Sequence, residues 1–557
     1  MAEETEPAPE VTDSAAGLLS QARQLVPEAL AEARAAAGFP ARWSSIASKI
    51  ERVAPSLSDL SSLPSFSRNA LCWELLQSVT IALRDAIGLA CRSGAPSGKL
   101  QMQSDLDAVS SELDLVLDDC ALLVKTGVLD DSAAAAAAAP HSLDKIRVLL
   151  ARLQIGHAEA KHRAVDALLE AMREDERSVT TALGRSNVSA LIRLLGSTSV
   201  KIKEKAATAI CLLAESGSCE NLIVSEAVLP PLIRLSESGS LICRQKALTS
   251  LQRLSVSTET ARSIVGHGGV RPLVDVCQAG DSICQSAASG TLKNLSAVPE
   301  VRQTLVEEGT ICVMIDLLNR GIVLSSKEHA AECLLNLTAS NDASRRLVVE
   351  EGGAPSLLAF LDGPLPKEPA VGALRNLIGA ATVDSLVSLG LLPRLLHVLR
   401  DGSLGAQQAA ASIICRISNS NEAKRSIGEL GCLPLLATML EAITNTAREV
   451  AAQAIAGLIS LPQNKSELKK DDKTVIVLVR LLDPNPQNTA TKYAISCLQS
   501  LSSSKRCRKL MLSYGAAGSL EKLAEVDMAG AKKLLKRLEK NKLRNLFIRK
   551  TGRYVLP

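Results

Sequence analysis

Aromatic side chains are scarce in this sequence: two Trp, three Tyr and four Phe make up 2% of its 557 residues. Apolar residues nevertheless account for 46% of the chain. A β-sandwich core draws on aromatic and β-branched side chains, whereas a core of Leu, Ala, Ile and Val suits closely packed helices. The composition therefore favours an all-α protein.

Long apolar runs and targeting signals are also missing. No stretch of 18 or more apolar residues occurs, so we predict no membrane-spanning helix. The acidic start MAEETEPAPE lacks the basic-then-apolar layout of a signal peptide, and neither Ala2 nor the ending YVLP signals lipid attachment. We therefore expect the protein in the cytosol, the nucleus or both.

Motifs that carry chemistry are absent as well. The sequence has no G-x-S-x-G, no H-E-x-x-H and no Walker-type loop. Its 14 cysteines stand singly, with no C-x-x-C pair and no His at metal-ligand spacing, which is typical of core residues in a reduced protein. We predict a protein that is not an enzyme and that needs no metal or cofactor.

What the sequence does contain is a repeat. The clearest copy, EEGGAPSLLAFL at 350–361, has a polar helix end, a Gly-Gly break, a Pro and an apolar helix. One apolar anchor recurs in each copy, 38 to 43 residues after the last: Leu150, Leu191, Leu232, Leu273, Met314, Leu357, Leu395, Leu436, Leu478 and Leu520. A fixed period of this length indicates a solenoid.

Each repeat is predicted to form three helices. A short helix precedes the Pro/Leu anchor, a second helix begins there, and a Gly or Ser break separates it from a longer third helix. One repeat cannot bury its apolar face alone, so neighbours must stack into a continuous core. We predict about nine to ten such units over residues 141–530.

The flanking segments differ from the repeats. Residues 1–13 are acidic and predicted to be disordered, and 14–130 are predicted to form a helical bundle that holds both tryptophans. Within the bundle we expect helices at 14–36, 71–91 and 104–129, with a Ser/Pro-rich joint at 54–67. Residues 131–140 form an Ala-rich linker, and 531–557 a basic capping helix and tail.

Charge separates the two ends of the chain. Residues 1–140 carry 10 Lys/Arg against 19 Asp/Glu, whereas 530–557 carry 10 Lys/Arg against one Glu. An acidic head and a basic tail can attract partners or each other.

The repeats resemble the armadillo-repeat family. The resemblance rests on the G-G-x-P-x-L turn, the period near 41, and third helices that read TLKNLSA, LLNLTAS and ALRNLIG. It implies an all-α, right-handed armadillo-repeat superhelix preceded by the N-terminal helical bundle, an arrangement closest to plant armadillo proteins.

A second likeness is to plant U-box ubiquitin ligases. The stretch ACRSGAPSGKLQM at 90–102 resembles a loop in the N-terminal domain of those ligases that also carry armadillo repeats. However, no U-box lies between the bundle and the repeats, because the Ala-rich linker is too short to hold one. The resemblance therefore does not extend to ligase activity.

The candidate binding residues are three asparagines, Asn294, Asn336 and Asn376, at one position of three successive third helices. In armadillo proteins that bind extended peptides, this asparagine bonds the peptide backbone, which an amide can do as both donor and acceptor. The alternative is a packing role between repeats. The same position elsewhere holds other residues: Leu212, Arg253, Arg416, Gly457 and Ser500.

The surroundings of these asparagines narrow the partner class. The tryptophans of nuclear-import adaptors are replaced, one turn earlier, by Gly290, Glu332 and Gly372, which disfavours a receptor for nuclear localisation signals. We expect three cations to line the same groove and to favour acidic or phosphorylated partners: Lys246, Arg253 and Arg416. The alternative is that these cations lie on helix edges that face solvent and bind no partner.

The basic C-terminal patch has several readings. It comprises Lys532, Lys533, Lys536, Arg537, Lys540, Lys542 and Arg544. It can cap the solenoid, bind an anionic membrane surface, bind nucleic acid or serve nuclear import, or dock onto the acidic bundle. The nucleic-acid reading lacks interleaved aromatic residues and a matching fold.

Together these features predict a non-enzymatic scaffold that binds extended segments of other proteins and takes no small-molecule substrate. Two alternatives stay open. One is an accessory role in ubiquitin ligation, and the other is a membrane-associated adaptor that acts through the basic C-terminal helix.

Overall fold

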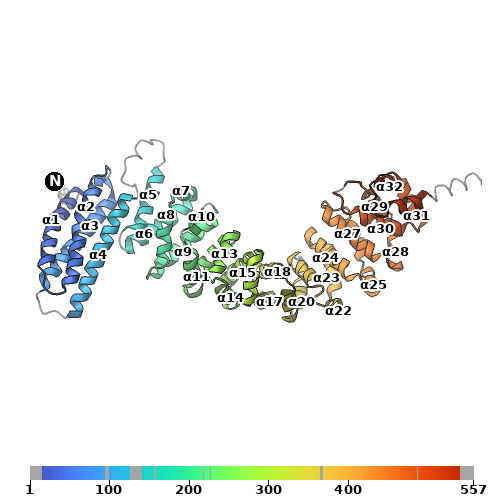
Figure 1. Cartoon of the computed structure of the whole chain (residues 1–557), viewed down its shortest axis with the longest axis horizontal. Coiled ribbons are helices and arrows are strands. Elements are labelled where there is room, and N and C mark those ends of the chain that lie inside the picture. Colours follow the sequence, from blue (N-terminus) through green and yellow to red (C-terminus); the bar gives the residue numbers. More distant parts are fainter. Residues whose placement is uncertain are drawn as a thin grey trace, which may run out of the picture. The chain divides into compact units, whose positions relative to one another are not determined.

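The computed structural model describes residues 15–539 apart from 65, 94–98, 126–140, 156–157, 218, 226, 364–367 and 486. Within these residues every regular element is a helix (Figure 1). The chain divides into two compact units, Met1–Leu254 and Ser255–Pro557, which we describe separately.

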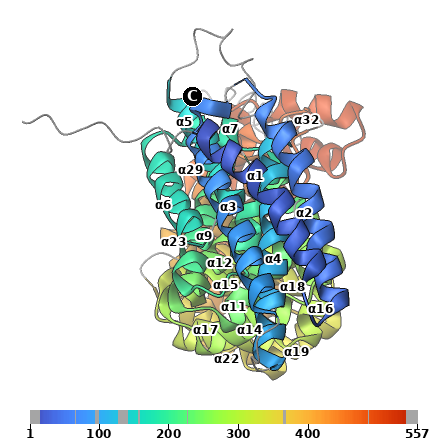
Figure 2. The same ribbon diagram turned by 90° about the vertical axis from the view of Figure 1, so that its left-hand side faces the viewer.

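Unit 1 begins with four long helices that lie alongside one another (Figures 1 and 2). They are α1 (Ala15–Ala35), α2 (Pro40–Ser61), α3 (Ala70–Arg92) and α4 (Lys99–Lys125), with a 3-10 turn η2 (Phe66–Arg68) between α2 and α3. The expected joint at 54–67 is therefore wrong over its first half, because α2 continues through Pro55 to Ser61. Buried Val53 and Leu57 hold this part of the helix against the core.

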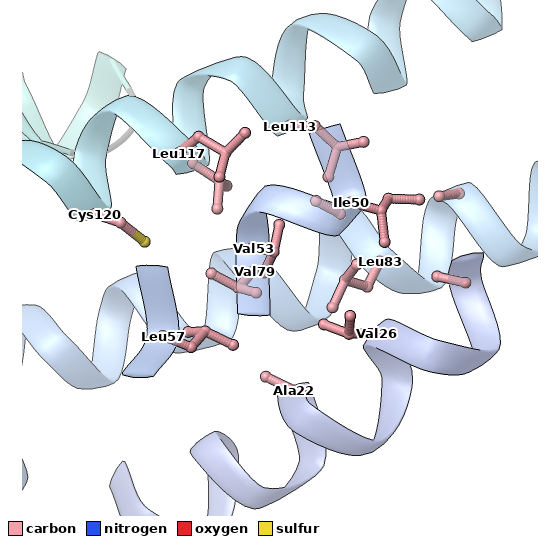
Figure 3. Packing of buried hydrophobic residues seen from close by; sticks show 14 of the residues in the cluster. Ala22, Val26, Ile50, Val53, Leu57, Val79, Leu83, Leu113, Leu117 and Cys120 are labelled. Carbon is pink, nitrogen blue, oxygen red and sulfur yellow. The ribbon is translucent and has the colours of Figure 1, made fainter. Parts of the chain in front are cut away.

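The bundle core draws on all four helices (Figure 3). Ala22 and Val26 of α1 lie near Val79 and Leu83 of α3, and α2 and α4 contribute the remaining labelled residues: Ile50, Val53, Leu57, Leu113, Leu117 and Cys120. The side chains are aliphatic and closely packed, which suits the ring-poor composition.

The same core extends into the first repeat. Ala151 and Ile155, at the end of α5 (His141–Gln154), belong to the bundle cluster and are nearly fully buried. Arg152 of α5 forms an ion pair with Glu74 of α3, with 3.0 Å between Nη2 and Oε1. The bundle therefore packs on the first repeat and covers its apolar surface.

The rest of unit 1 consists of one helix pair and two triplets. The pair is α5 with α6 (Ala158–Glu174). The triplets are α7 (Glu176–Ala182), α8 (Arg185–Leu194), α9 (Val200–Glu215), and α10 (Glu220–Ser225), α11 (Leu229–Ser238), α12 (Leu241–Leu254).

Unit 2 continues with triplets in the same order of short, second and long third helix. They are α13 (Thr258–Gly266), α14 (Val270–Ala279), α15 (Ser282–Ala297); η4 (Pro299–Val301) with α16 (Arg302–Glu307), α17 (Thr310–Arg320), α18 (Leu324–Thr338); α19 (Asp342–Glu350), α20 (Gly353–Phe360), α21 (Glu368–Leu377); α22 (Val383–Ser388), α23 (Leu391–Asp401), α24 (Leu404–Ile417); α25 (Asn421–Glu429), α26 (Cys432–Met439), α27 (Asn445–Leu458); α28 (Pro462–Leu468), α29 (Asp472–Arg480), α30 (Thr491–Leu501); and α31 (Lys505–Ser513), α32 (Ala516–Glu525) with a last helix at 531–539.

The repeat anchors lie in the core of this stack. Each of the ten anchor residues named from the sequence is at most 1% exposed. Within unit 2, third helices pack against the third helices of adjacent repeats, as α15 does on α18 and α18 on α21. The predicted all-α solenoid preceded by a helical bundle is confirmed.

Glycine sets the turn between the first and second helices. Gly352, just before α20, has φ +77°, a conformation that side chains with a Cβ rarely adopt. A Cβ on the adjacent Gly353 would lie 2.8 Å from the carbonyl oxygen of Val348. The Gly-Gly of the repeat thus serves two separate needs, a left-handed backbone and a close helix approach.

Candidate functional site

The three asparagines singled out from the sequence lie on adjacent third helices of unit 2. Asn294 is on α15, Asn336 on α18 and Asn376 on α21, and all three side chains are half-buried. We call these residues the asparagine row.

Each amide in the row donates a hydrogen bond to the repeat before it. The Nδ2 of Asn294 donates to the hydroxyl of Ser255 at 2.9 Å. The Nδ2 of Asn336 donates to the hydroxyl of Ser296 at 3.0 Å. In the preceding third helix, the position equivalent to the asparagine is Arg253 for the first pair and Asn294 for the second. In both pairs the accepting hydroxyl stands two residues after that position, so the same contact recurs from one repeat to the next.

Asn376 makes two such bonds. Its Nδ2 donates to the hydroxyl of Thr338 at 3.2 Å and to the carbonyl oxygen of Leu335 at 3.3 Å. In the next repeat Arg416 occupies the asparagine position, and its Nη1 donates to the carbonyl oxygen of Arg375 at 3.2 Å. Arg375 is the counterpart of Leu335, so arginine replaces asparagine as the donor between repeats.

The last helix repeats this arrangement once more. Arg537 donates through Nη1 to the carbonyl oxygen of Gln499 at 3.1 Å and to the hydroxyl of Ser502 at 3.2 Å. These acceptors are the counterparts of Leu335 and Thr338. Arg537, predicted only as part of a basic patch, thus also ties the last helix to α30.

The row still offers acceptors for a ligand. Within the described part of the chain, the Oδ1 atoms of Asn336 and Asn376 receive no hydrogen bond. Donation through Nδ2 fixes the orientation of each amide plane. What remains is therefore a pair of pre-oriented carbonyl oxygens on two adjacent helices, suited to bonding N–H groups.

Small and charged residues surround the row. A Cβ on Gly372 of α21 would lie 2.9 Å from Cδ1 of Leu335, so the glycine allows α21 to approach α18 closely. Lys293 and Glu332 face each other with 3.9 Å between Nζ and Oε2. An ion pair with both charge signs therefore lies beside the row.

His329 of α18 contacts the preceding repeat. Its Nδ1 lies 3.3 Å from the hydroxyl of Ser289 on α15. Burial lowers the pKa of His329, and the nearby Lys293 lowers it further. The imidazole is therefore held in its neutral form, available for hydrogen bonding within the stack.

The other predicted groove cations lie in unit 1. Lys246 is half-buried and Arg253 exposed, both on α12. Burial raises the pKa of the Cys211 thiol on α9, and these two cations counteract that rise, which places both near α9. They belong to the other compact unit from the asparagine row and Arg416.

The basic C-terminal stretch is described as far as Glu539. Lys532, Lys533, Lys536 and Arg537 are exposed, whereas Leu534 and Leu538 on the same helix are fully buried. Lys532 is paired with Asp527 at 2.6 Å. Lys540, Lys542 and Arg544 lie outside the described residues.

The cysteines are mostly core residues. Burial raises the pKa of the Cys333 and Cys497 thiols to about 12, so both stay protonated near neutral pH and lack nucleophilic character. Among the residues that the structure describes, no group of three or more His, Cys, Asp or Glu could hold a metal ion. No described helix is long and apolar enough to span a membrane.

Sequence reasoning missed the arginine donors and the hydroxyls that receive them. A signal was present: Ser255, Ser296, Thr338, Ser418 and Ser502 all stand two residues after the asparagine position or its equivalent. A hydroxyl that recurs two residues after the asparagine position in several repeats is typical of a contact between repeats.

Comparison with known proteins supports the fold. Residues 20–128, which span most of the bundle, match a family model described as a domain of unknown function, DUF7032. No curated protein matches the chain. The crystal structure of an engineered protein from a structural genomics consortium superposes with a TM-score of 0.58 at 24% identity, covering 72% of this chain and 98% of its own.

Two designed armadillo repeat proteins also match over a smaller part. One, in complex with the peptide (KR)4, has 22% identity and a TM-score of 0.37; the other has 23% identity and a TM-score of 0.38. Both cover 41% of this chain and 99% of their own. The helix triplets and the longer superposition define the chain as an all-α solenoid of three-helix repeats.

Proposed function

We propose that the protein is a non-enzymatic scaffold that binds an extended segment of another protein along the third helices of unit 2. The observation that carries the proposal is the pair of pre-oriented acceptors, Oδ1 of Asn336 and Oδ1 of Asn376, on neighbouring helices. An extended chain presents backbone N–H groups that such acceptors can bond without reading side chains.

The composition of this face supports a neutral or mixed-charge segment better than a strongly charged one. Lys293 faces Glu332, and Arg416 already donates to the backbone of Arg375. A partner segment would therefore gain affinity from backbone bonds and shape, with charge setting orientation.

The test must separate binding from packing, because each amide does both. The chain itself supplies the control, since Arg416 and Arg537 make the same contact between repeats without an acceptor. Asn336→Arg with Asn376→Arg should keep the donor and remove the two Oδ1 acceptors. Asn336→Ala with Asn376→Ala removes both donor and acceptor.

The experiment is an affinity capture from cell extract with the full-length wild type and the two double variants, alongside thermal melts. We expect both variants to lose the same partners, with the arginine variant melting close to the wild type. Partners lost only from the alanine variant would assign the row to packing. Identical partner sets for all three proteins would contradict the proposal.

A further inference from the structure

A pocket with its own charged residues lies on unit 1. It has a volume of about 290 Å³ and is bounded by the turns between second and third helices of two consecutive repeats, α8/α9 and α11/α12. Its apolar lining includes Leu195, Val200, Pro231 and Leu235, and its cations are Lys203 and Arg234. We call it the edge pocket.

The rim of the edge pocket exposes aliphatic side chains. Val200 is 52% exposed, and Leu241 and Ile242, which directly follow the pocket residue Ser240, are 58% and 46% exposed. Apolar side chains gathered at a concave place and edged by polar groups mark interaction sites more often than scattered ones do. The pocket is small for a cofactor but sufficient for an anchoring side chain.

The two cations have no internal counterpart. Within the described residues, neither Lys203 nor Arg234 lies within ion-pair distance of a carboxylate. Glu204, next to Lys203 in the chain, accepts from the hydroxyl of the pocket residue Ser240 at 2.6 Å and keeps its negative charge, and Glu237 is exposed. The pocket therefore offers two cations outside ion pairs, with one carboxylate bonded at its lining.

The charge at the position of Arg234 varies between second helices, and Arg193 and Arg480 are also cations there. The counterparts of Arg234 in the next two second helices are Asp275 and Asp316. Each of these is paired within its own helix, Asp275 with Arg271 at 3.2 Å and Asp316 with Arg320 at 3.3 Å. The same helix position is thus an unpaired cation here and a paired anion further along.

We infer that the edge pocket docks an acidic segment of a partner protein whose aliphatic side chain enters the pocket while flanking carboxylates meet Lys203 and Arg234. Apolar burial supplies the anchor, and charge complementarity selects the partner and orients it. This surface is formed by the edge of the solenoid and is independent of the amide acceptors on the third helices of unit 2.

The probe is a fluorescent peptide, EEDLLDEE, titrated with the full-length protein and followed by fluorescence anisotropy at about 0.1 M salt, where the Debye length is about 10 Å. Two comparison peptides, EEDSSDEE and KKNLLNKK, remove the aliphatic anchor or reverse the charge. We expect EEDLLDEE to bind at least tenfold more tightly than either.

The variants separate the two elements of the pocket. Lys203→Glu with Arg234→Glu should weaken binding of EEDLLDEE at least tenfold, and Lys203→Gln with Arg234→Gln should weaken it less. Val200→Ser should weaken it without changing charge. A matched control, Arg173→Glu with Arg177→Glu, makes the same change of net charge at exposed positions outside the pocket and should leave binding intact.

Three results would overturn the inference: no binding of EEDLLDEE to the wild type, equal affinity for EEDSSDEE, or equal loss in the pocket and control variants. The variant Asn336→Arg with Asn376→Arg should bind the peptide like the wild type. Failure of the proposed groove therefore leaves this test unaffected, and the reverse also holds. Circular dichroism confirms that each variant is folded.

Discussion

Arg152 of the first repeat forms an ion pair with Glu74 of the bundle at 3.0 Å, beside the place where Ile155 enters the bundle core. The pair is partly exposed and by itself contributes little. It marks a junction at which two segments that differ in sequence pattern share one apolar core.

Sharing that core should couple the unfolding of the bundle to the first repeat. Replacing Ile155 by Ala removes buried atoms on the repeat side at a cost of about 2–5 kcal/mol. Both tryptophans, Trp43 and Trp73, lie in the bundle, so urea unfolding followed by tryptophan fluorescence should shift to a lower midpoint. Leu357→Ala in unit 2 is the control and should leave this fluorescence transition in place.

The bond between Asn336 and Ser296 should be measurable by a double-mutant cycle. Each alanine substitution alone is expected to cost about 1 kcal/mol, because it leaves half-buried Asn336 or fully buried Ser296 without this bond. The double variant should lose less than the sum of the two single variants. Additive losses in urea denaturation would show that the two side chains do not stabilise each other.

A side chain at position 372 should displace that of Leu335. A Cβ there would lie 2.9 Å from Cδ1 of Leu335, the end of a half-buried side chain, so Gly372→Ala is expected to cost about 1 kcal/mol by overpacking. Adding Leu335→Ala should recover part of that loss. If the single variant melts like the wild type, the helices are free to move apart and the close approach is not required.

His329 should make stability depend on pH. Burial and Lys293 lower its pKa in the folded state below the ordinary histidine value of 6.5, so the unfolded chain binds the proton more readily. Its contribution is therefore present above pH 6.5 and is lost as the pH falls through the lower, folded-state pKa.

The measurement compares urea unfolding of the wild type and His329→Gln at pH 7.5 and pH 5.5. The wild type should lose more stability on acidification than the variant does. An equal loss would assign the pH dependence to other groups.

The period of the sequence predicts the solenoid well because its physical cause is local. An anchor such as Leu357 must be buried in every repeat, and the Gly-Gly before it must allow a left-handed turn, so both leave a regular trace. The helix α2 was missed altogether, and over its second half Ser and Pro residues suggested a joint. Tertiary burial of Val53 and Leu57 outweighs that local preference.

The candidate site was less predictable. The sequence indicates the position of the asparagines, but the choice of partner atom depends on the neighbouring repeat about 40 residues away. Arg416 looked like a departure from the row and Arg537 like part of a basic patch, yet each donates to the same kind of acceptor as Asn376. Asparagine and arginine can both donate to the same acceptor of the preceding repeat, so residue identity alone does not reveal this contact.

The bond from Asn336 to Ser296 also bears on how such a chain can change in length. Each of the three amides donates to a hydroxyl of the repeat immediately before it. Duplication or loss of one whole repeat in this region would therefore recreate the same bond at the new junction. An insertion of a few residues within a third helix would break it, which leaves whole repeats as the unit in which the array can grow or shorten.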